Sequence, residues 1–342
     1  MIKLSFHDLV HVSEGDGVGA TLGNTADLAA HAEALGFTRY WIAEHHGLAG
    51  VASSATAILI CHVAAATNAM RIGAGGIMLP NHAPLVVAEQ FGTLDALYPG
   101  RIDLGLGRAP GGDGRVIQAL RRTFEAGANA FPQDVDELRS YFTDDSQTGV
   151  VAIPGAGANP QIWILGSGLN GARLAAAFGL RFAFASHFAP EALDQALAIY
   201  RREFRPSTQL AAPYAAAGLN VYAADSDEQG ELIATSQQQF TVELYAGRPG
   251  PLRPPVAQYR DRVGPQGAAT IDHVLRCSVA GGPAKIAAGL ADFAERTKVD
   301  EIMVSSAIYD HSARRRSLEI TAQVASQSIV ERIGDADGGS RF

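Results

Sequence analysis

Three adjacent ionisable residues, Glu44, His45 and His46, stand directly after the apolar run 40–43. A carboxylate and two imidazoles are costly to bury, so this pattern predicts a strand that leaves the protein core at Glu44. Imidazole titrates near neutral pH, which suits general acid–base chemistry. Ligands of parallel α/β folds bind where the strands end, and we therefore take this triplet as the centre of a candidate site.

The triplet allows three interpretations: a metal site, a buried structural histidine or an acid–base group. Adjacent side chains of a strand point to opposite faces, and no HExxH pattern or carboxylate cluster joins them, so we predict no metal site. We expect His45 to act in catalysis and His46 to be structural, because strand alternation turns His46 away from its neighbour. Glu44 would orient the ring of His45 or hydrogen-bond a cofactor.

A second candidate site lies at Gly166, Ser167, Gly168 and Asn170, where a predicted strand breaks and a helix begins. Such a turn exposes backbone N–H groups at the positive end of the helix dipole, and the two polar side chains add donors. Arg108 follows the neighbouring predicted strand and can pair with a phosphate through two N–H groups. An ordinary helix cap and a surface ion pair are the alternatives. Together, the residues favour one phosphate monoester, as in FMN.

Glycines and polar residues also end other predicted strands. Gly75 and Gly76 interrupt a strand, which indicates a bulge, tight packing or a flat backbone surface against a planar ring. The spacing does not decide between these. We assign Ser186 and His187, which follow a later strand, to a substrate pocket.

The elements that must position these residues alternate along the chain. Eight short apolar runs are separated by helical patterns, which predicts an α/β fold with parallel strands closed into a (β/α)₈ TIM barrel. The runs are residues 2–7, 38–43, 71–78, 101–105, 161–165, 181–185, 219–223 and 301–304. An open doubly wound sheet is the competing fold, but no complete GxGxxG pattern follows the first run, which disfavours it.

We expect a single domain over residues 1–342. The stretch 8–23 contains four glycines and predicts a loop. The stretch 246–267 is rich in proline and glycine without periodicity, which predicts a lid, an insertion or a mobile loop. The tail 334–342 is expected to fray.

Composition limits the classes of function. Hydrophobic residues make up 47% and charged residues 18% of the 342 residues, which favours a large core over disorder. The net charge of −8 argues against nucleic acid as a partner. The two cysteines, Cys61 and Cys277, form no CxxC pattern and fit a reducing compartment. No apolar stretch is long enough to cross a bilayer, so we expect a cytoplasmic protein without a membrane partner.

Several motifs, taken in order along the chain, resemble those of a known protein family. They are residues 41–46 (WIAEHH), 73–80 (GAGGIMLP), 88–91 (AEQF), 100–111 (GRIDLGLGRAPG), 182–188 (FAFASHF) and 300–304 (DEIMV). With them the chain resembles the bacterial luciferase-like flavin monooxygenase family, and within it the alkanal-monooxygenase-like branch. The resemblance implies a (β/α)₈ barrel, usually dimeric, that binds FMN at the carboxyl mouth.

The resemblance also implies roles for single residues. His45 falls on the catalytic histidine that assists the reaction of the reduced flavin with O₂. Gly75 and Gly76 fall where the family often has a non-prolyl cis peptide beneath the flavin ring. The phosphate-binding positions are Arg108, Gly166, Ser167 and Asn170. Bacterial luciferase has a glutamate where this chain has Gly166, so light emission and an aldehyde substrate are not carried over.

The resulting hypothesis is a monooxygenase that uses reduced FMN and O₂ on a small organic substrate. No second dinucleotide site is predicted, so reduced flavin would come from a separate reductase. The alternatives are a hydride-transferring enzyme that uses the deazaflavin F420 or a flavin, and a flavin-binding protein without catalytic activity. The pattern does not identify the organic substrate.

Overall fold

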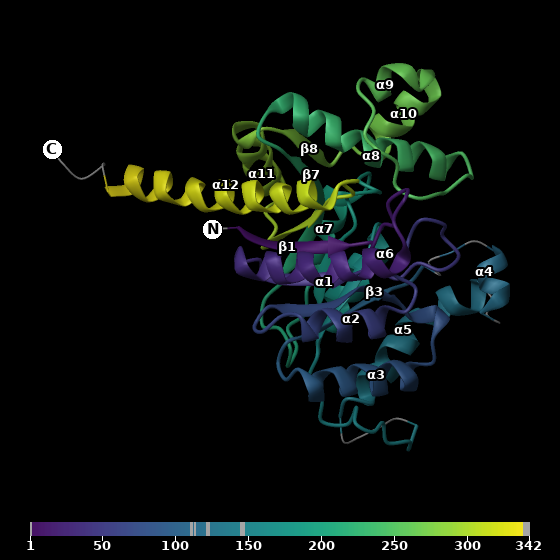
Figure 1. The fold of residues 1–342 in the computed structure, drawn as a ribbon. Helices are drawn as coiled ribbons and strands as arrows, with labels where there is room; N and C mark the ends of the chain where they lie inside the picture. Colours follow the sequence, from purple (N-terminus) through teal and green to yellow (C-terminus); the bar gives the residue numbers. More distant parts are fainter. Residues whose placement is uncertain (1, 110–111, 113, 121–123, 144–147, 338–342) are drawn as a thin grey trace.

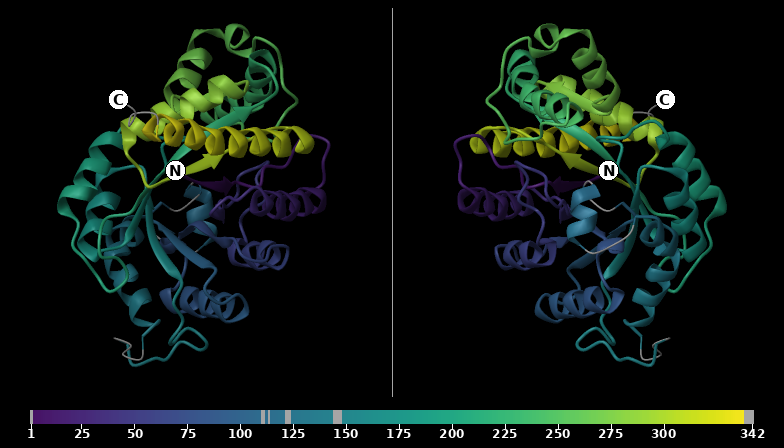
Figure 2. Two further views of the ribbon diagram at one scale, coloured as in Figure 1. Left: turned by 90° about the vertical axis from the view of Figure 1, so that its left-hand side faces the viewer. Right: turned by 90° about the vertical axis from the view of Figure 1, so that its right-hand side faces the viewer.

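Parallel strands around a closed barrel dominate the fold (Figures 1 and 2). The computed structural model describes residues 2–109, 112, 114–120, 124–143 and 148–337. Its strands are β1 (Lys3–Asp8), β2 (Arg39–Ile42), β3 (Arg71–Met78), β4 (Ile102–Gly107), β5 (Gln161–Gly166), β6 (Arg181–Phe184), β7 (Ala215–Ala223), β8 (Ser278–Gly281) and β9 (Glu301–Ser305).

Pairing along the sheet closes the predicted barrel. The strand order is β6-β5-β4-β3-β2-β1-β9-β7, and β6 pairs with β7 to complete the ring. Every pairing is parallel; for example, Phe6 lies opposite Tyr40 on one side and Val304 on the other. The barrel therefore confirms the (β/α)₈ prediction over the open doubly wound sheet. All carboxyl ends of the strands meet at one mouth, which faces the viewer in the right panel of Figure 2.

The strand β8 was missed by the sequence prediction. It pairs only with the second half of β7, where Asn220 lies opposite Ser278, while β6 pairs with the first half. The prediction also started β7 at residue 219, whereas it begins at Ala215. The alanines at 215–217 have weak strand propensity, and β8 is a four-residue strand with two glycine or alanine positions, so neither gives a strong local signal.

Helices cover the outside of the barrel between strands. They are α1 (Val18–Ala34), α2 (Thr56–Ala65), the 3₁₀ turn η1 (Leu79–Asn81), α3 (Pro84–Leu97), α4 (Gly114–Ala119), α5 (Phe124–Ser140), α6 (Leu169–Phe178), α7 (Leu193–Glu203), α8 (Asp227–Tyr245), α9 (Tyr259–Arg262), α10 (Gly264–Val274), α11 (Pro283–Thr297) and α12 (His311–Asp337). In Figure 1, α8, α9 and α10 form a lobe above the mouth.

Three loop predictions need correction. The predicted loop 8–23 ends early, because α1 begins at Val18. The predicted irregular segment 246–267 contains α9 and the start of α10. The part of this segment that precedes α9 is held against the loop after β1, because the Leu252 backbone N–H donates a hydrogen bond to the Val12 carbonyl at 2.8 Å. The helix α12 continues through residue 337, so the predicted frayed tail is helical at its start, and residues 338–342 lie outside the described part.

A buried ion network ties the strands together inside the barrel. The Arg39 guanidinium contacts Asp103 at 2.6 Å and Glu301 at 2.7 Å. Arg71 adds a contact of 2.7 Å to Asp103, and the Tyr214 hydroxyl donates to Glu301 at 2.8 Å. These groups come from β2, β3, β4 and β9 and from the residue before β7, so their pairing fixes the register of strands that are distant in sequence.

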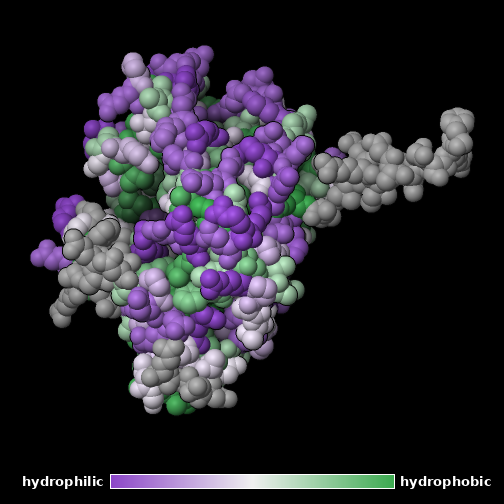
Figure 3. All heavy atoms as spheres, turned by 180° about the vertical axis from the view of Figure 1, so that it is seen from behind, coloured by the Kyte–Doolittle hydropathy of each residue, from purple (hydrophilic) through white to green (hydrophobic). Residues whose placement is uncertain are grey.

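The outer surface is mixed in polarity. Seen from behind, polar side chains cover most of the face, with apolar ones scattered between them (Figure 3). Within the described residues, no helix combines the length and the apolar character that a membrane crossing requires.

Candidate active site at the carboxyl mouth

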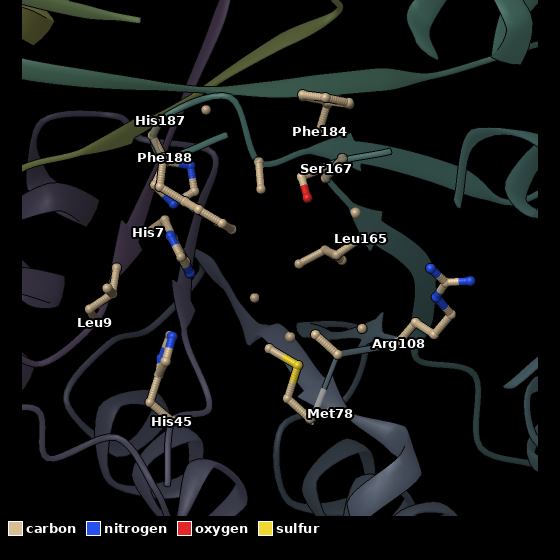
Figure 4. Close-up of a pocket in the computed structure, with 18 of the residues that line it drawn as sticks. His7, Leu9, His45, Met78, Arg108, Leu165, Ser167, Phe184, His187 and Phe188 are labelled. Atoms are coloured by element: carbon tan, nitrogen blue, oxygen red, sulfur yellow. The ribbon is translucent and has the colours of Figure 1, made fainter. Parts of the chain in front are cut away.

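A cavity of about 1400 Å³ opens at the carboxyl mouth of the barrel. Its lining comes from residues that follow most of the barrel strands, and from α6, α8 and α10. Figure 4 places His7, His45 and His187 along one side and Arg108 with Ser167 on the other. The strand ends thus assemble one site, as expected from the parallel topology.

Gly75 and Gly76 also line this cavity. The peptide bond between them is cis, which confirms the expectation drawn from the resemblance. A Cβ on Gly75 would lie 2.8 Å from Cδ2 of His7, and a Cβ on Gly76 would lie 2.7 Å from the Gly105 carbonyl oxygen. Only glycine fits at these two positions, and the wall there is bare backbone. A planar ring can approach such a surface closely.

The opposite side of the cavity collects groups that bind anions. Ser167 and Asn170 are exposed to the cavity at the start of α6, whose N-cap residue Gly168 makes no side-chain cap. The first N–H groups of α6 are therefore available to a ligand. Arg108 and Arg173 line the same region, and no described carboxylate pairs with either of them. These donors fit a phosphate group.

Glu44 does not line this cavity but lies behind it, buried, with 1% of its surface exposed. Its carboxylate accepts hydrogen bonds from Nε2 of His46 at 2.8 Å and from Nε2 of His82 at 2.9 Å. The Met78 backbone N–H donates to the other oxygen at 3.0 Å, and the Asn81 amide donates at 3.3 Å. Glu44 therefore joins the segment after β2 to the segment after β3.

This cluster fits a structural role for His46 but corrects the expected direction of its side chain. The strand β2 ends at Ile42, so the alternation that was to turn His46 away does not extend to it. His46 instead folds back onto Glu44 and also lines the cavity. Glu44, His46 and His82 are close enough to share a metal ion. However, both oxygens of Glu44 already accept hydrogen bonds, and these account for the buried charge without an ion.

Electrostatics separate the roles of these groups. Burial alone would raise the pKa of Glu44, but hydrogen bonds from His46 and His82 outweigh it and lower that pKa to about 2. The same hydrogen bond raises the pKa of His46. Burial lowers the pKa of His45, although the charge of Glu44 partly opposes this. His45 is therefore a neutral imidazole at neutral pH, able to accept or donate a proton.

His45 and His187 reach the cavity, whereas Ser186 does not. The Nδ1 atoms of both histidines are buried and have no hydrogen-bond partner among the described residues. The Ser186 hydroxyl points the other way and donates to the Gly218 carbonyl at 2.6 Å. A Cβ on Gly218 would lie 2.2 Å from Nδ1 of His187, so this glycine makes room for the ring. Ser186 supports the wall that His187 forms.

Several site residues were missed by the sequence analysis. They are His7, His11, His82 and Arg173. His7 stands at the end of β1, and a polar residue at the end of an apolar run is the same signal that identified Glu44. His11 lies in a loop, His82 follows the turn η1 and Arg173 lies within α6. A single polar residue in any of these places has no distinctive sequence pattern.

The fold and the cavity define a (β/α)₈ barrel protein with a cavity at its carboxyl mouth. Residues 2–301 match the family model described as luciferase-like monooxygenase, and the chain belongs to that family. A relative from Escherichia coli strain K12, named luciferase-like monooxygenase, is 46% identical over 329 residues, which cover 96% of this chain and 98% of the relative.

Solved structures agree with this assignment. The apo form of MsnO8 is 31% identical, covers 95% of this chain and 99% of its own, and superposes with a TM-score of 0.88. The oxygenating constituent of 3,6-diketocamphane monooxygenase from Pseudomonas putida, solved in complex with FMN, has a TM-score of 0.69 at 17% identity. It covers 94% of this chain and 96% of its own, and shows a shared fold.

Proposed function

We propose that this chain is a monooxygenase that uses reduced FMN and O₂ on a small organic substrate. The observation that carries the proposal is one cavity that combines a bare glycine wall, the N-terminus of α6 without a side-chain cap, and the His45 imidazole, whose buried Nδ1 has no partner among the described residues. Family membership supports the reaction class. Bound reduced flavin would supply the electrons that activate O₂.

The residues on the phosphate side would anchor the cofactor. Arg108 offers two parallel N–H groups, and the start of α6 adds backbone donors together with Ser167 and Asn170. Gly75 and Gly76 would admit the flavin ring, because any side chain there would collide with neighbouring atoms. Leu165, Met78 and Trp41 line the cavity and would exclude water.

His45 would be the group that moves a proton at the reacting atoms. Its Nδ1 atom has no partner within the described chain, and burial keeps the ring neutral at neutral pH. Glu44 would act through other residues, since it holds His46 and His82 rather than facing the cavity. We therefore revise its expected role from a cofactor contact to a positioning residue.

The test separates cofactor binding from turnover. Arg108→Ala should weaken FMN binding about tenfold or more, because a charge-assisted hydrogen bond to phosphate is lost. His45→Ala should keep FMN affinity and lose substrate-dependent O₂ consumption. Fluorescence titration with FMN and an oxygen electrode measure the two effects, and Arg202→Ala on the exposed face of α7 is the control.

Other outcomes would assign a different function. Turnover without O₂ consumption would indicate hydride transfer with F420 or a flavin. FMN binding without turnover by any substrate would indicate a flavin-binding protein. Unchanged FMN affinity in Arg108→Ala would refute the phosphate site, and normal oxygenation by His45→Ala would refute the role of that histidine.

We also propose that a separate reductase supplies the reduced flavin and that the chain works as a cytoplasmic homodimer. Exposed apolar side chains support self-association: Ile58 on α2 is 71% exposed and Leu97 on α3 is 58% exposed. Light scattering of the purified chain tests the dimer, and a monomer at working concentrations would refute it.

A further inference from the structure

Four imidazoles gather on the side of the cavity away from Arg108. His7 ends β1, His11 follows it, His45 follows β2 and His187 follows β6, and all four line the cavity. Figure 4 shows three of them, His7, His45 and His187, next to one another. The rings of His7 and His187 meet edge to face with centroids 5.2 Å apart. We refer to these four residues as the histidine patch.

The histidine patch has unused hydrogen-bonding capacity. The Nδ1 atoms of His11, His45 and His187 are buried and have no partner within the described residues. These Nδ1 atoms are buried within the cavity wall, so a ligand in the cavity would contact the three rings through the other ring nitrogen, Nε2. Because no group among the described residues fixes which nitrogen carries the hydrogen, each of these rings can place an N–H group at Nε2 and donate it to that ligand.

The surroundings make the patch receptive to negative charge. Among the described residues that line the cavity, none is Asp, Glu or Lys. The nearest carboxylates are already paired: Asp8 accepts from Arg314 at 2.6 Å and from Tyr40 at 2.5 Å, and Glu44 is held by His46 and His82. The charged and titratable groups that act on the four rings are therefore Asp8, Arg314, Glu44, His46 and the rings themselves.

Burial disfavours the protonated form of all four rings. Burial lowers the pKa of His7 to about 4 and that of His11 to about 3, and it lowers the pKa of His187 well below its usual value. A bound anion opposes this effect by favouring the protonated ring. Beside the patch, Leu9, Leu48, Phe240 and Met303 form an apolar wall that suits a short carbon chain.

We infer that the histidine patch binds the carboxylate of a small organic acid, with its apolar body against the neighbouring wall, as the substrate of the proposed monooxygenase. A carboxylate only accepts hydrogen bonds, so it takes N–H groups from two of the rings. Binding would draw a proton from solvent onto one ring. This inference rests on the proposed function, because it names the substrate class of that site.

Calorimetry tests the inference without turnover. We would titrate the FMN-saturated protein with hexanoate, and with hexanamide as the neutral analogue of equal length, in two buffers that differ in ionisation enthalpy. We expect hexanoate to bind about tenfold or more tightly than hexanamide, since it gains charge-assisted hydrogen bonds. Only hexanoate should take up protons, seen as a buffer-dependent binding enthalpy, with weaker binding as the pH rises.

Variants assign the effect to the patch. His7→Gln and His187→Gln keep a hydrogen-bonding side chain but cannot gain a proton, so each should reduce the proton uptake and the preference for hexanoate. His62→Gln, on an exposed position of α2, is the matched control and should change neither. Circular dichroism verifies that the variants fold.

Three results would overturn the inference. They are equal affinity for hexanoate and hexanamide, proton uptake that both variants retain, and loss of hexanoate binding when FMN is present. The last result would show that the patch serves the cofactor. The FMN titration is a separate measurement, so failure to bind FMN would refute the proposed function, whereas FMN binding without acid binding refutes this inference alone.

Discussion

At the scale of single residues, Glu44 and its histidine neighbours divide the work between support and chemistry. Glu44 connects two segments through His46 and His82, while His45 lines the cavity and its Nδ1 atom has no partner among the described residues. The sequence was enough to select Glu44 and His45 as candidate site residues, because ionisable residues after an apolar strand are rare. The partner His82 was not, because a hydrogen bond across 38 positions leaves no local pattern.

We predict that Glu44→Gln destabilises the protein by about 1–3 kcal/mol, because a buried hydrogen-bond network loses its charge and one of its two acceptor oxygens. The pKa of Glu44 is lowered from 4.5 to about 2, so its contribution is complete above pH 4.5 and is lost as the pH falls toward 2. Urea unfolding of both proteins at decreasing pH measures this difference, which should shrink below pH 4.5.

The control for this prediction is Glu231→Gln, which alters an exposed ion pair with Lys285. It should change the unfolding free energy by less than about 1 kcal/mol at every pH. A loss in Glu44→Gln that stays constant through the acid range would show that the charge of Glu44 is not what stabilises the segment.

At the scale of elements, the ion network inside the barrel aligns strands that are far apart in the sequence. We predict that Arg39→Ala destabilises the protein by about 3–5 kcal/mol, because it leaves Asp103 and Glu301 buried beside a lost partner. Chemical denaturation measures the change. The matched control is Arg260→Ala, whose exposed ion pair with Asp272 is screened by water, so its loss should leave the free energy of unfolding nearly unchanged. Similar losses in both variants would contradict the role of burial.

The same scale shows which elements a sequence reveals. The helix α3 carries clear sequence signals at both ends, since Pro84 favours a first helical position and Pro99 follows its end. The strand β8 was missed, because its pairing with β7 depends on β6 leaving that edge of the sheet after Ala217. Strand pairing is decided by neighbours, and a four-residue segment carries little propensity of its own.

At the scale of the whole molecule, the segment after α8 reaches back to the first loop of the chain. Leu252 is buried against Phe240 and Ala307, and its backbone pairs with Val12 and Glu14. Pro249, near Leu252, lines the cavity. We therefore propose that residues 246–258 cover the site and are held in place by these contacts, as part of a single domain.

We predict that Leu252→Ala loosens this cover, because it removes buried apolar contacts worth about 2–5 kcal/mol. Hydrogen exchange of residues 249–258 should accelerate about tenfold or more, while exchange in β1 to β4 should change far less. Mass spectrometry of exchanged peptides measures this, with Leu97→Ala on the exposed side of α3 as control. Equal acceleration throughout the barrel would mean that the segment is part of the global core instead.

The sequence by itself determined the alternation of strands and helices, the barrel that follows from it, and the residues placed after strand ends, such as His45 and Ser167. These are local patterns, and the parallel topology brings strand ends to one mouth whatever the loops do. Only the tertiary structure decided that His46 turns back to Glu44, that Ser186 points away from the cavity, and that His7, His11 and His187 join His45. Those contacts depend on side-chain directions and on barrel closure, which a linear pattern does not contain.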